Sequence, residues 1–235
     1  WVEDHYAVIK AVTEPGGAHR VEFTRHDAAG QRLGPPRVLY EGNADAGLPI
    51  RLIERPLVWT GERYVLTFYH YGDHVIWFDP DGEVSNHIEL PERVSFVFPD
   101  GDGVVLFAHG DHGLVLWELT HDALPVRRET QTPSPTQMLA ATQWDQGYGV
   151  VFDSWQGAEF AQLSRDGATT GVRTLLPLFT PHQNRPVSDI VWHPDLREFA
   201  ILGGSSIGGR RYSAHLLRVD AAGARRRRRR PLGAP

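Results

Sequence analysis

Two short stretches of the chain place paired histidines around a glycine and an aspartate, which are side chains from which a metal site can be built. Residues 69–78 read YHYGDHVIWF and residues 108–117 read AHGDHGLVLW. A closed zinc site needs about four ligands around one point, so the candidate ligands are His70, His74, His109 and His112. The alternative is a pair of solvated turns in which Gly-Asp supplies the bend. We favour the alternative, and therefore expect neither a metal nor another cofactor.

A second set of candidates consists of carboxylates that each stand a few residues before an aromatic residue. These are Glu54 in IERPLVW, Glu92 in PERVSFVF and Asp189 in VSDIVW. Glycoside hydrolysis requires convergent carboxylates, one as the acid and another as the base or nucleophile. The alternative is an acidic rim, neutralised where Arg55 and Arg93 adjoin two of the three carboxylates. We favour the acidic rim.

Two further segments resemble binding or catalytic elements. Trp155 lies in the turn SWQG, where a tryptophan has little core to fill, so it is a candidate contact for a ligand or partner. Residues 204–208 read GSSIG and match G-x-S-x-G, which exposes a nucleophile where a strand turns into a helix. Here the match lies between two expected strands, so we do not expect a nucleophile.

These candidates lie within or next to a sequence repeat. Each copy of the repeat consists of an apolar strand, a turn with glycine, a second strand and a second polar turn. The copies are Tyr6–Gly30, Arg63–Val84, Val104–Val126, Tyr148–Val172 and Phe199–Gly223. The second turn reads DAAG at 27–30, DPDG at 79–82 and DAAG again at 220–223. Asp and Gly suit tight turns because glycine accepts positive φ and aspartate bonds its own backbone. Apolar residues alternate or form short runs, which predicts strands rather than helices.

A further strand precedes each later copy and ends in an aromatic residue, namely Trp59, Phe98, Trp144 or Trp192. We expect these aromatic residues to pack between neighbouring units. Trp1 stands five residues before Tyr6, as Trp59 stands before Tyr64. The first copy is therefore expected to lack most of its first strand.

With the segments after the second turn, each unit contains four antiparallel strands. The copies start at Tyr6, Tyr64, Val104, Tyr148 and Phe199, which are 58, 40, 44 and 51 residues apart and bracket the roughly 40 to 50 residues typical of propeller blades. The order of Trp, short turn, Tyr-x-Val-Val, Gly turn, strand and D-x-x-G turn resembles bacterial β-propeller repeat proteins of the secreted or periplasmic type. The resemblance implies an all-β propeller of about five four-stranded antiparallel blades, the first incomplete at the N-terminus. The expected blades are residues 1–40, 50–90, 92–130, 137–176 and 187–224. They form one domain, 1–224, before an Arg-rich low-complexity tail at 225–235.

Charge and composition exclude several classes of function. The formal charge of −5 includes six consecutive arginines at 225–230, so the remainder carries −11. An acidic body is a poor match for a nucleic acid, and no apolar run approaches the roughly 20 residues of a membrane helix. We expect neither a nucleic-acid partner nor a membrane span. The absence of cysteine excludes disulfides and thiolate ligands.

Propeller proteins of this kind include enzymes, lectins and scaffolds, so the resemblance implies an architecture rather than a particular activity. We expect a non-catalytic binding or scaffold propeller that recognises a protein or glycan through loops on the channel-entry face. The alternative is a five-bladed glycoside hydrolase that uses Glu54, Glu92 and Asp189. An extracellular or periplasmic location is expected.

Overall fold

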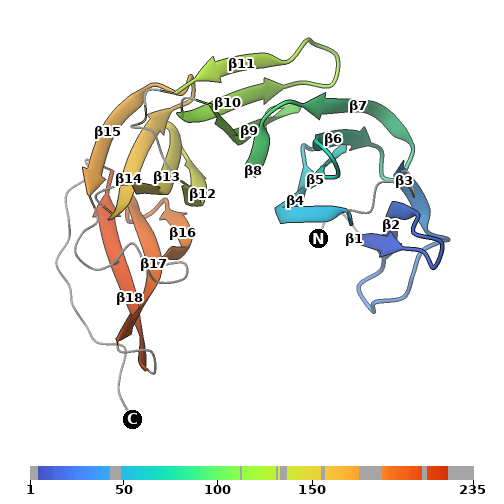
Figure 1. Ribbon diagram of the computed structural model, residues 1–235, viewed down its shortest axis with the longest axis horizontal. Coiled ribbons are helices and arrows are strands. Elements are labelled where there is room, and N and C mark those ends of the chain that lie inside the picture. Colours follow the sequence, from blue (N-terminus) through green and yellow to red (C-terminus); the bar gives the residue numbers. More distant parts are fainter. Residues whose placement is uncertain are drawn as a thin grey trace. The chain divides into compact units, whose positions relative to one another are not determined.

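The fold was determined from a computed structural model of residues 1–235. The structure describes residues 5–42, 49–111, 113–130, 132, 137–154, 157–174, 187–207 and 211–221. Across these ranges the chain forms eighteen strands, β1 to β18, and no helix (Figure 1). Nothing in the same ranges has the helical length and apolarity that a membrane crossing needs. The prediction of an all-β chain is confirmed.

The strands fall into two compact units, residues 1–110 with 116–127 and residues 111–115 with 128–235. The first unit begins with a three-stranded sheet of β1 (Tyr6–Thr13), β2 (His19–His26) and β3 (Arg37–Gly42), in that order. The next sheet is ordered β4 (Arg51–Trp59), β5 (Tyr64–Tyr69), β6 (Asp73–Phe78) and β7 (Val84–Leu90). The third sheet, most of which belongs to this unit, contains β8 (Arg93–Asp100), β9 (Gly103–Gly110), β10 (Gly113–Leu119) and β11 (Val126–Glu129).

The second unit contains two sheets. One is ordered β12 (Gln137–Trp144), β13 (Gly147–Ser154), β14 (Gly157–Ser164) and β15 (Thr169–Thr174). The other is ordered β16 (Val187–His193), β17 (Glu198–Ile207) and β18 (Arg211–Asp220). Among the described residues the first sheet has three strands and begins with β1, which corresponds to β5 because Tyr6 begins β1 as Tyr64 begins β5, and this agrees with the predicted incomplete first blade. We did not predict that the described part of the last sheet would also have three strands.

The recurring Asp-x-x-Gly turns have one shared geometry. Gly30 N donates to Asp27 O at 3.0 Å, and Gly82 N donates to Asp79 O at the same distance. Both glycines have positive φ, 79° and 82°. In each turn the aspartate Oδ1 accepts two backbone N–H groups, from Ala29 and Gln31 or from Asp81 and Glu83. The aspartate and glycine are therefore required by the bend itself.

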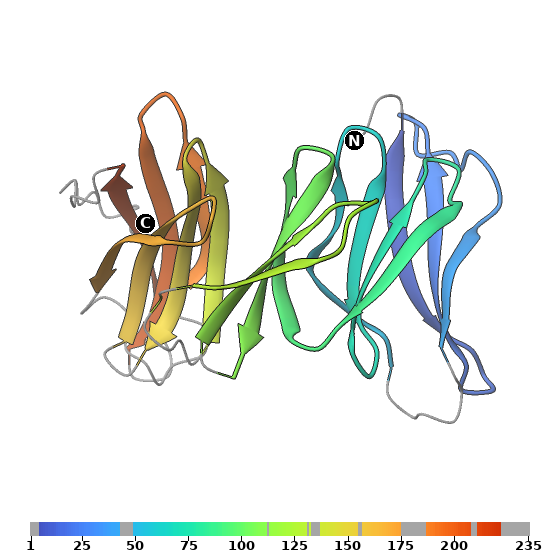
Figure 2. The ribbon, with the colours of Figure 1, turned by 90° about the horizontal axis from the view of Figure 1, so that it is seen from above.

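In the sheet β4–β7 the middle strands β5 and β6 are buried on both faces. One face packs on the sheet β1–β3 through Tyr64, Leu66, Phe68, Ile76, Phe78, Val21 and Phe23. The opposite face packs on β8 and β9 through Val65, Val75, Trp77, Val94, Val97 and Leu106. Figure 2 shows the sheets β1–β3 and β4–β7 standing side by side. Burial on both faces explains why β5 and β6 are continuous apolar runs rather than alternating ones.

The core of the second unit contains a group of aromatic rings among aliphatic side chains. The Trp144 ring lies 5.2 Å from Trp192 and 5.6 Å from Phe199, and the Phe199 ring lies 5.0 Å from Phe160. These side chains join β12 and β14 to β16 and β17. The prediction that the strand-ending aromatic residues pack between neighbouring blades is confirmed for Trp144 and Trp192, which lie in adjacent sheets of this unit.

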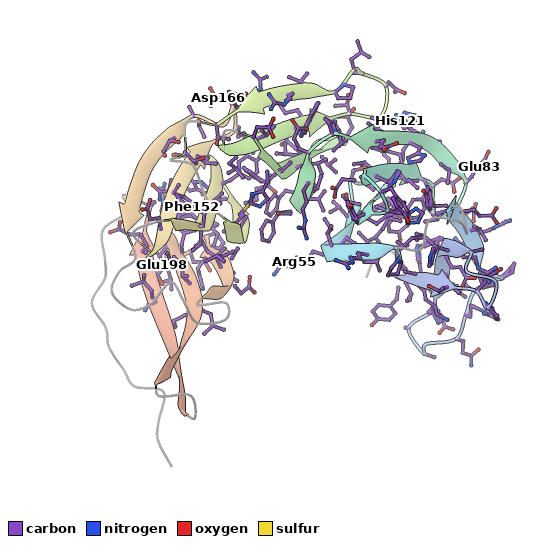
Figure 3. All side chains as sticks on the ribbon, in the orientation of Figure 1. Arg55, Glu83, His121, Phe152, Asp166 and Glu198 are labelled. Carbon is purple, nitrogen blue, oxygen red and sulfur yellow. The ribbon has the colours of Figure 1, made fainter. Side chains whose placement is uncertain are left out.

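The first strand of each later sheet carries an irregularity near its start. The register shifts in β4 between Leu52 and Leu57, and comparable shifts occur in β8, β12 and β16. The shift in β4 includes Arg55 at a φ of 55°, a left-handed conformation that is uncommon outside glycine. Figure 3 labels Arg55 on this strand and Glu83 at the turn between β6 and β7. The bulges were not predicted from the sequence.

Substitution of one core residue tests the packing of the second unit. Phe199 is completely buried, so Phe199→Ala is expected to lower the free energy of unfolding by about 3 to 5 kcal/mol. Leu216, on the other face of the same sheet, is 54% exposed, and Leu216→Ala is expected to change the free energy by at most about 0.5 kcal/mol. Urea unfolding of both variants measures the difference, and equal losses would contradict the assignment of faces.

Candidate functional site

The turn between β5 and β6 contains the first histidine pair. Residues 70–72 connect Tyr69 to Asp73, which are paired across the hairpin, and His70 N donates to Gly72 O at 2.9 Å. Tyr71 has a φ of 61°, and 47% of its surface is exposed. A bulky residue in the left-handed region is held there against a backbone preference. The turn therefore presents Tyr71 to solvent in one enforced conformation.

Beneath Tyr71, His70 and His74 are buried and hydrogen-bonded on the side that faces the first sheet. Tyr40 Oη lies 3.0 Å from His70 Nδ1, and His74 Nε2 lies 2.8 Å from the His70 carbonyl oxygen. On the other ring nitrogen, His74 Nδ1 lies 3.0 Å from His87 Nε2. The bonds connect the turn to β3 and to β7, neither of which the histidine pattern indicated.

When His74 and His87 are both neutral, these contacts determine which of their ring nitrogens carry a hydrogen. A carbonyl oxygen only accepts, so His74 Nε2 must donate to His70 O. Neutral His74 then offers Nδ1 as an acceptor, and His87 Nε2 donates to it. Burial and the neighbouring His74 lower the pKa of His87, and Glu89 acts in the opposite direction.

The first sheet approaches the turn closely. Gly42, at the end of β3, leaves no room for a side chain, because a Cβ there would lie 2.4 Å from His70 Cε1. The ring of His19, which pairs with Gly42 in register, lies 5.7 Å from the His70 ring. We call the set His19, Tyr40, His70, His74 and His87 the histidine cluster. Its members come from four strands and the β5–β6 turn.

Glu89 closes the outer side of the same turn. It pairs with His74 in register, and its carboxylate lies so close to Gly72 that a Cβ at position 72 would be 2.5 Å from Glu89 Oε1. Glu89 is exposed. Burial, and then the charge of Glu89, raise the pKa of Tyr40. The glycine of the Gly-Asp-His sequence thus serves to admit this carboxylate, as well as to bend the chain.

Asp73 points to the opposite face of the sheet, towards β8. It is 3% exposed, and its carboxyl group accepts a backbone hydrogen bond from Val94. Within the described ranges no donor reaches Asp73 Oδ1. Burial raises the pKa of Asp73 from 3.8 to about 6, against the opposing effects of Val94 and Arg93. His109 pairs with Arg93 in register, and burial together with the charge of Arg93 lowers the pKa of His109.

The proposed metal ligands therefore have different surroundings. His70 and His74 join the histidine cluster, whereas the contacts described for His109 involve Arg93. His112 lies outside the described residues. Among those that are described, no three histidine or carboxylate side chains are arranged to hold a metal ion. The expectation that the four histidines hold no metal stays a prediction, because His112 is not among the described residues.

The carboxylates of the hydrolase alternative are described here by their own contacts. Glu92 accepts from Arg127 Nε at 2.6 Å and from Trp117 Nε1 at 3.1 Å. Asp189 accepts from the N–H of its neighbour Ile190 at 2.8 Å. Glu54 lies on β4, but its side chain is outside the described part of the structure. Trp155 is likewise outside it, so its role as a contact stays a prediction.

Sequence reasoning did not identify Tyr40, His87, Glu89 or Tyr71 as site residues. Tyr71 lies inside the stretch 69–78 that was considered as a metal site. A bulky residue immediately before the turn glycine was the signal that could have identified it. The other three lie on β3 and β7, and no spacing in the sequence joins them to the turn.

No protein-family model and no curated protein matches the chain. Solved structures do match. TolB from Acinetobacter baumannii aligns with a TM-score of 0.51 and 15% identity, over 93% of this chain and 51% of that chain. A prolyl endopeptidase chain aligns with a TM-score of 0.58 and 16% identity, over 94% and 32%. A chain of the mitotic checkpoint complex aligns with a TM-score of 0.59 and 11% identity, over 92% and 68%.

TolB and the checkpoint-complex chain are β-propeller proteins, and the prediction of a propeller with about five antiparallel blades is confirmed, with four strands described in three of the sheets and three in the other two. Such low identities establish the fold alone. The chain spans about half the length of the TolB chain and about a third of the endopeptidase chain.

The burial of Asp73 predicts a specific dependence of stability on pH. Folded Asp73 keeps its proton up to about pH 6, whereas the unfolded chain releases it from about 3.8, so ionisation disfavours folding as the pH rises. Asp73→Asn is expected to raise the free energy of unfolding by about 3 kcal/mol at pH 7 and by less than about 1 kcal/mol at pH 4. Chemical unfolding at both pH values measures the change. An equal effect at both would contradict a buried carboxyl group.

Proposed function

We propose that the chain is a non-catalytic binding propeller, whose β5–β6 turn contacts a protein or glycan partner. The observation that carries the proposal is Tyr71, which is 47% exposed and has a φ of 61°. An unfavourable backbone conformation persists when the surrounding structure imposes it, and such residues concentrate at functional sites. Here the histidine cluster and Gly72 impose it.

The turn has the properties of a preorganised contact. Tyr71 stands on buried side chains that are hydrogen-bonded to β3 and β7, so the ring loses little conformational freedom when a partner binds. Tyrosine also combines a large apolar ring with a hydroxyl group, which suits both proteins and sugars.

The fold comparison supports a scaffold role by analogy. One of the matching propellers belongs to the mitotic checkpoint complex, which is a protein assembly. An extracellular or periplasmic location is part of the proposal and rests on the blade resemblance. No observation within the described ranges favours the glycoside hydrolase, because Glu92 is held by Arg127 and Trp117. That alternative stays a prediction.

Substitution at position 71 separates binding from stability. Tyr71→Gly removes the strain of the left-handed backbone, so the free energy of unfolding is expected to stay unchanged or rise by up to about 1 kcal/mol. Affinity for the partner is expected to fall at least about tenfold because the ring is lost. Tyr71→Phe, which keeps the ring, is the matched control.

The partner is identified with a photo-crosslinking residue at position 71 in producing cells, and with a glycan array for sugars. The same residue at position 83, on the turn between β6 and β7, reports background (Figure 3). No adduct specific to position 71, together with no bound glycan, would contradict the proposal. A Tyr71→Gly protein that binds as well as the natural one would do so too.

A further inference from the structure

The surface beside Tyr71 carries a carboxylate. Glu89 is exposed, and its side chain lies against Gly72, the residue that follows Tyr71. The Tyr71 ring is itself oriented by the edge of His70, with the ring centroids 4.9 Å apart. An aromatic residue and a carboxylate that lies against the next residue therefore occur at the same end of the β5–β6 hairpin.

Glu89 is not neutralised by a neighbouring cation in the described part of the chain. No described arginine or lysine forms an ion pair with it, although other carboxylates do have such partners, as Glu92 has Arg127. Arg51 pairs with Tyr69, and by the alternation of side chains it projects to the face opposite that of Glu89. The titratable groups that Glu89 influences are His87, whose pKa is lowered overall by burial and by His74, and Tyr40, whose pKa is raised by burial and by Glu89.

These two groups suit one class of ligand. A guanidinium or ammonium group is attracted to the face of an aromatic ring within about 6 Å. The same cation can bond a carboxylate at the ring edge. Outside the six arginines at 225–230 the chain carries a formal charge of −11, which favours encounter with a basic partner.

We propose that the surface formed by Tyr71 and Glu89 recognises a basic segment of a protein partner, with one arginine or lysine placed over the Tyr71 ring and beside the Glu89 carboxylate. This inference rests on the proposed function and specifies its partner. The Tyr71 ring attracts the cation through its π face, and the Glu89 carboxylate forms an ion pair with the same cation. Glycan recognition is the competing outcome of the experiment.

The test uses a capped hexa-arginine peptide as the probe, titrated into the full chain and followed by the backbone amide signals of Tyr71, Gly72 and Glu89 in NMR spectra. Capped hexaserine and a neutral hexasaccharide are titrated in parallel. The expected result is binding of the arginine peptide alone, weakened at least about fivefold between 20 and 300 mM salt because exposed charges are screened.

Variants then locate the site. Glu89→Gln and Tyr71→Ala are each expected to weaken peptide binding about five- to tenfold, and Tyr71→Phe is expected to weaken it less than about twofold. Glu83→Gln is the matched control, since it removes the same charge from the far end of the β6–β7 pair. It is expected to leave binding unchanged.

Two results would overturn the inference. One is an equal loss in the Glu83→Gln and Glu89→Gln variants, which would show that diffuse acidity alone attracts the peptide. The other is binding of the hexasaccharide rather than the arginine peptide. In either case a specific crosslink or glycan at position 71 would leave the proposed binding function intact, so the two failures are distinguishable.

Discussion

Burial of the middle of the sheet β4–β7 on both faces is the constraint on which the rest of the first unit depends. Its middle strands β5 and β6 must supply apolar side chains in both directions, one set for the sheet β1–β3 and one for β8 and β9. Because successive residues of a strand point to opposite faces, adjacent residues in β5 and β6 meet different neighbours. Val65 and Leu66 belong to separate cores for this reason.

The same alternation organises the polar end of the sheet. Asp73 and His74 are adjacent in the chain, yet Asp73 faces Val94 and His74 faces the first sheet and His87. Polar side chains at the end of a doubly buried sheet require partners there, since an unpaired buried group is costly. In the histidine cluster, Tyr40 supplies such a partner to His70 Nδ1, and His87 and a backbone carbonyl supply partners to the two ring nitrogens of His74. Asp73 meets it in part through Val94, and burial raises the pKa of its carboxyl group despite that hydrogen bond.

A propeller fold leaves function to the surface of its loops and turns. The solved structures that match this chain have names as different as TolB, prolyl endopeptidase and mitotic checkpoint complex. Their common architecture therefore does not select an activity. What distinguishes this chain is local: a tyrosine held in an unfavourable conformation, with buried histidines below it and a carboxylate beside it.

The sequence by itself determined the strands, the turns and the number of blades, because these depend on short-range chemistry. Glycine at positive φ and aspartate bonding its own backbone define the turns at Gly30 and Gly82 wherever they occur. The offset between Trp1 and Tyr6 was enough to predict a first sheet without its inner strand. The bulges in the first strands carried no such local signal.

The candidate site was only partly predictable. His70 and His74 were identifiable as histidines flanking a turn, but the pattern also suggested His109 as their companion. Tertiary structure decided that their partners are Tyr40, from a sheet some thirty residues earlier, and His87, from the next strand of the same sheet. The reason is physical: a hairpin sequence dictates its own bend, whereas the side chains it meets are decided by the register of its strands and by the neighbouring sheet that covers each face.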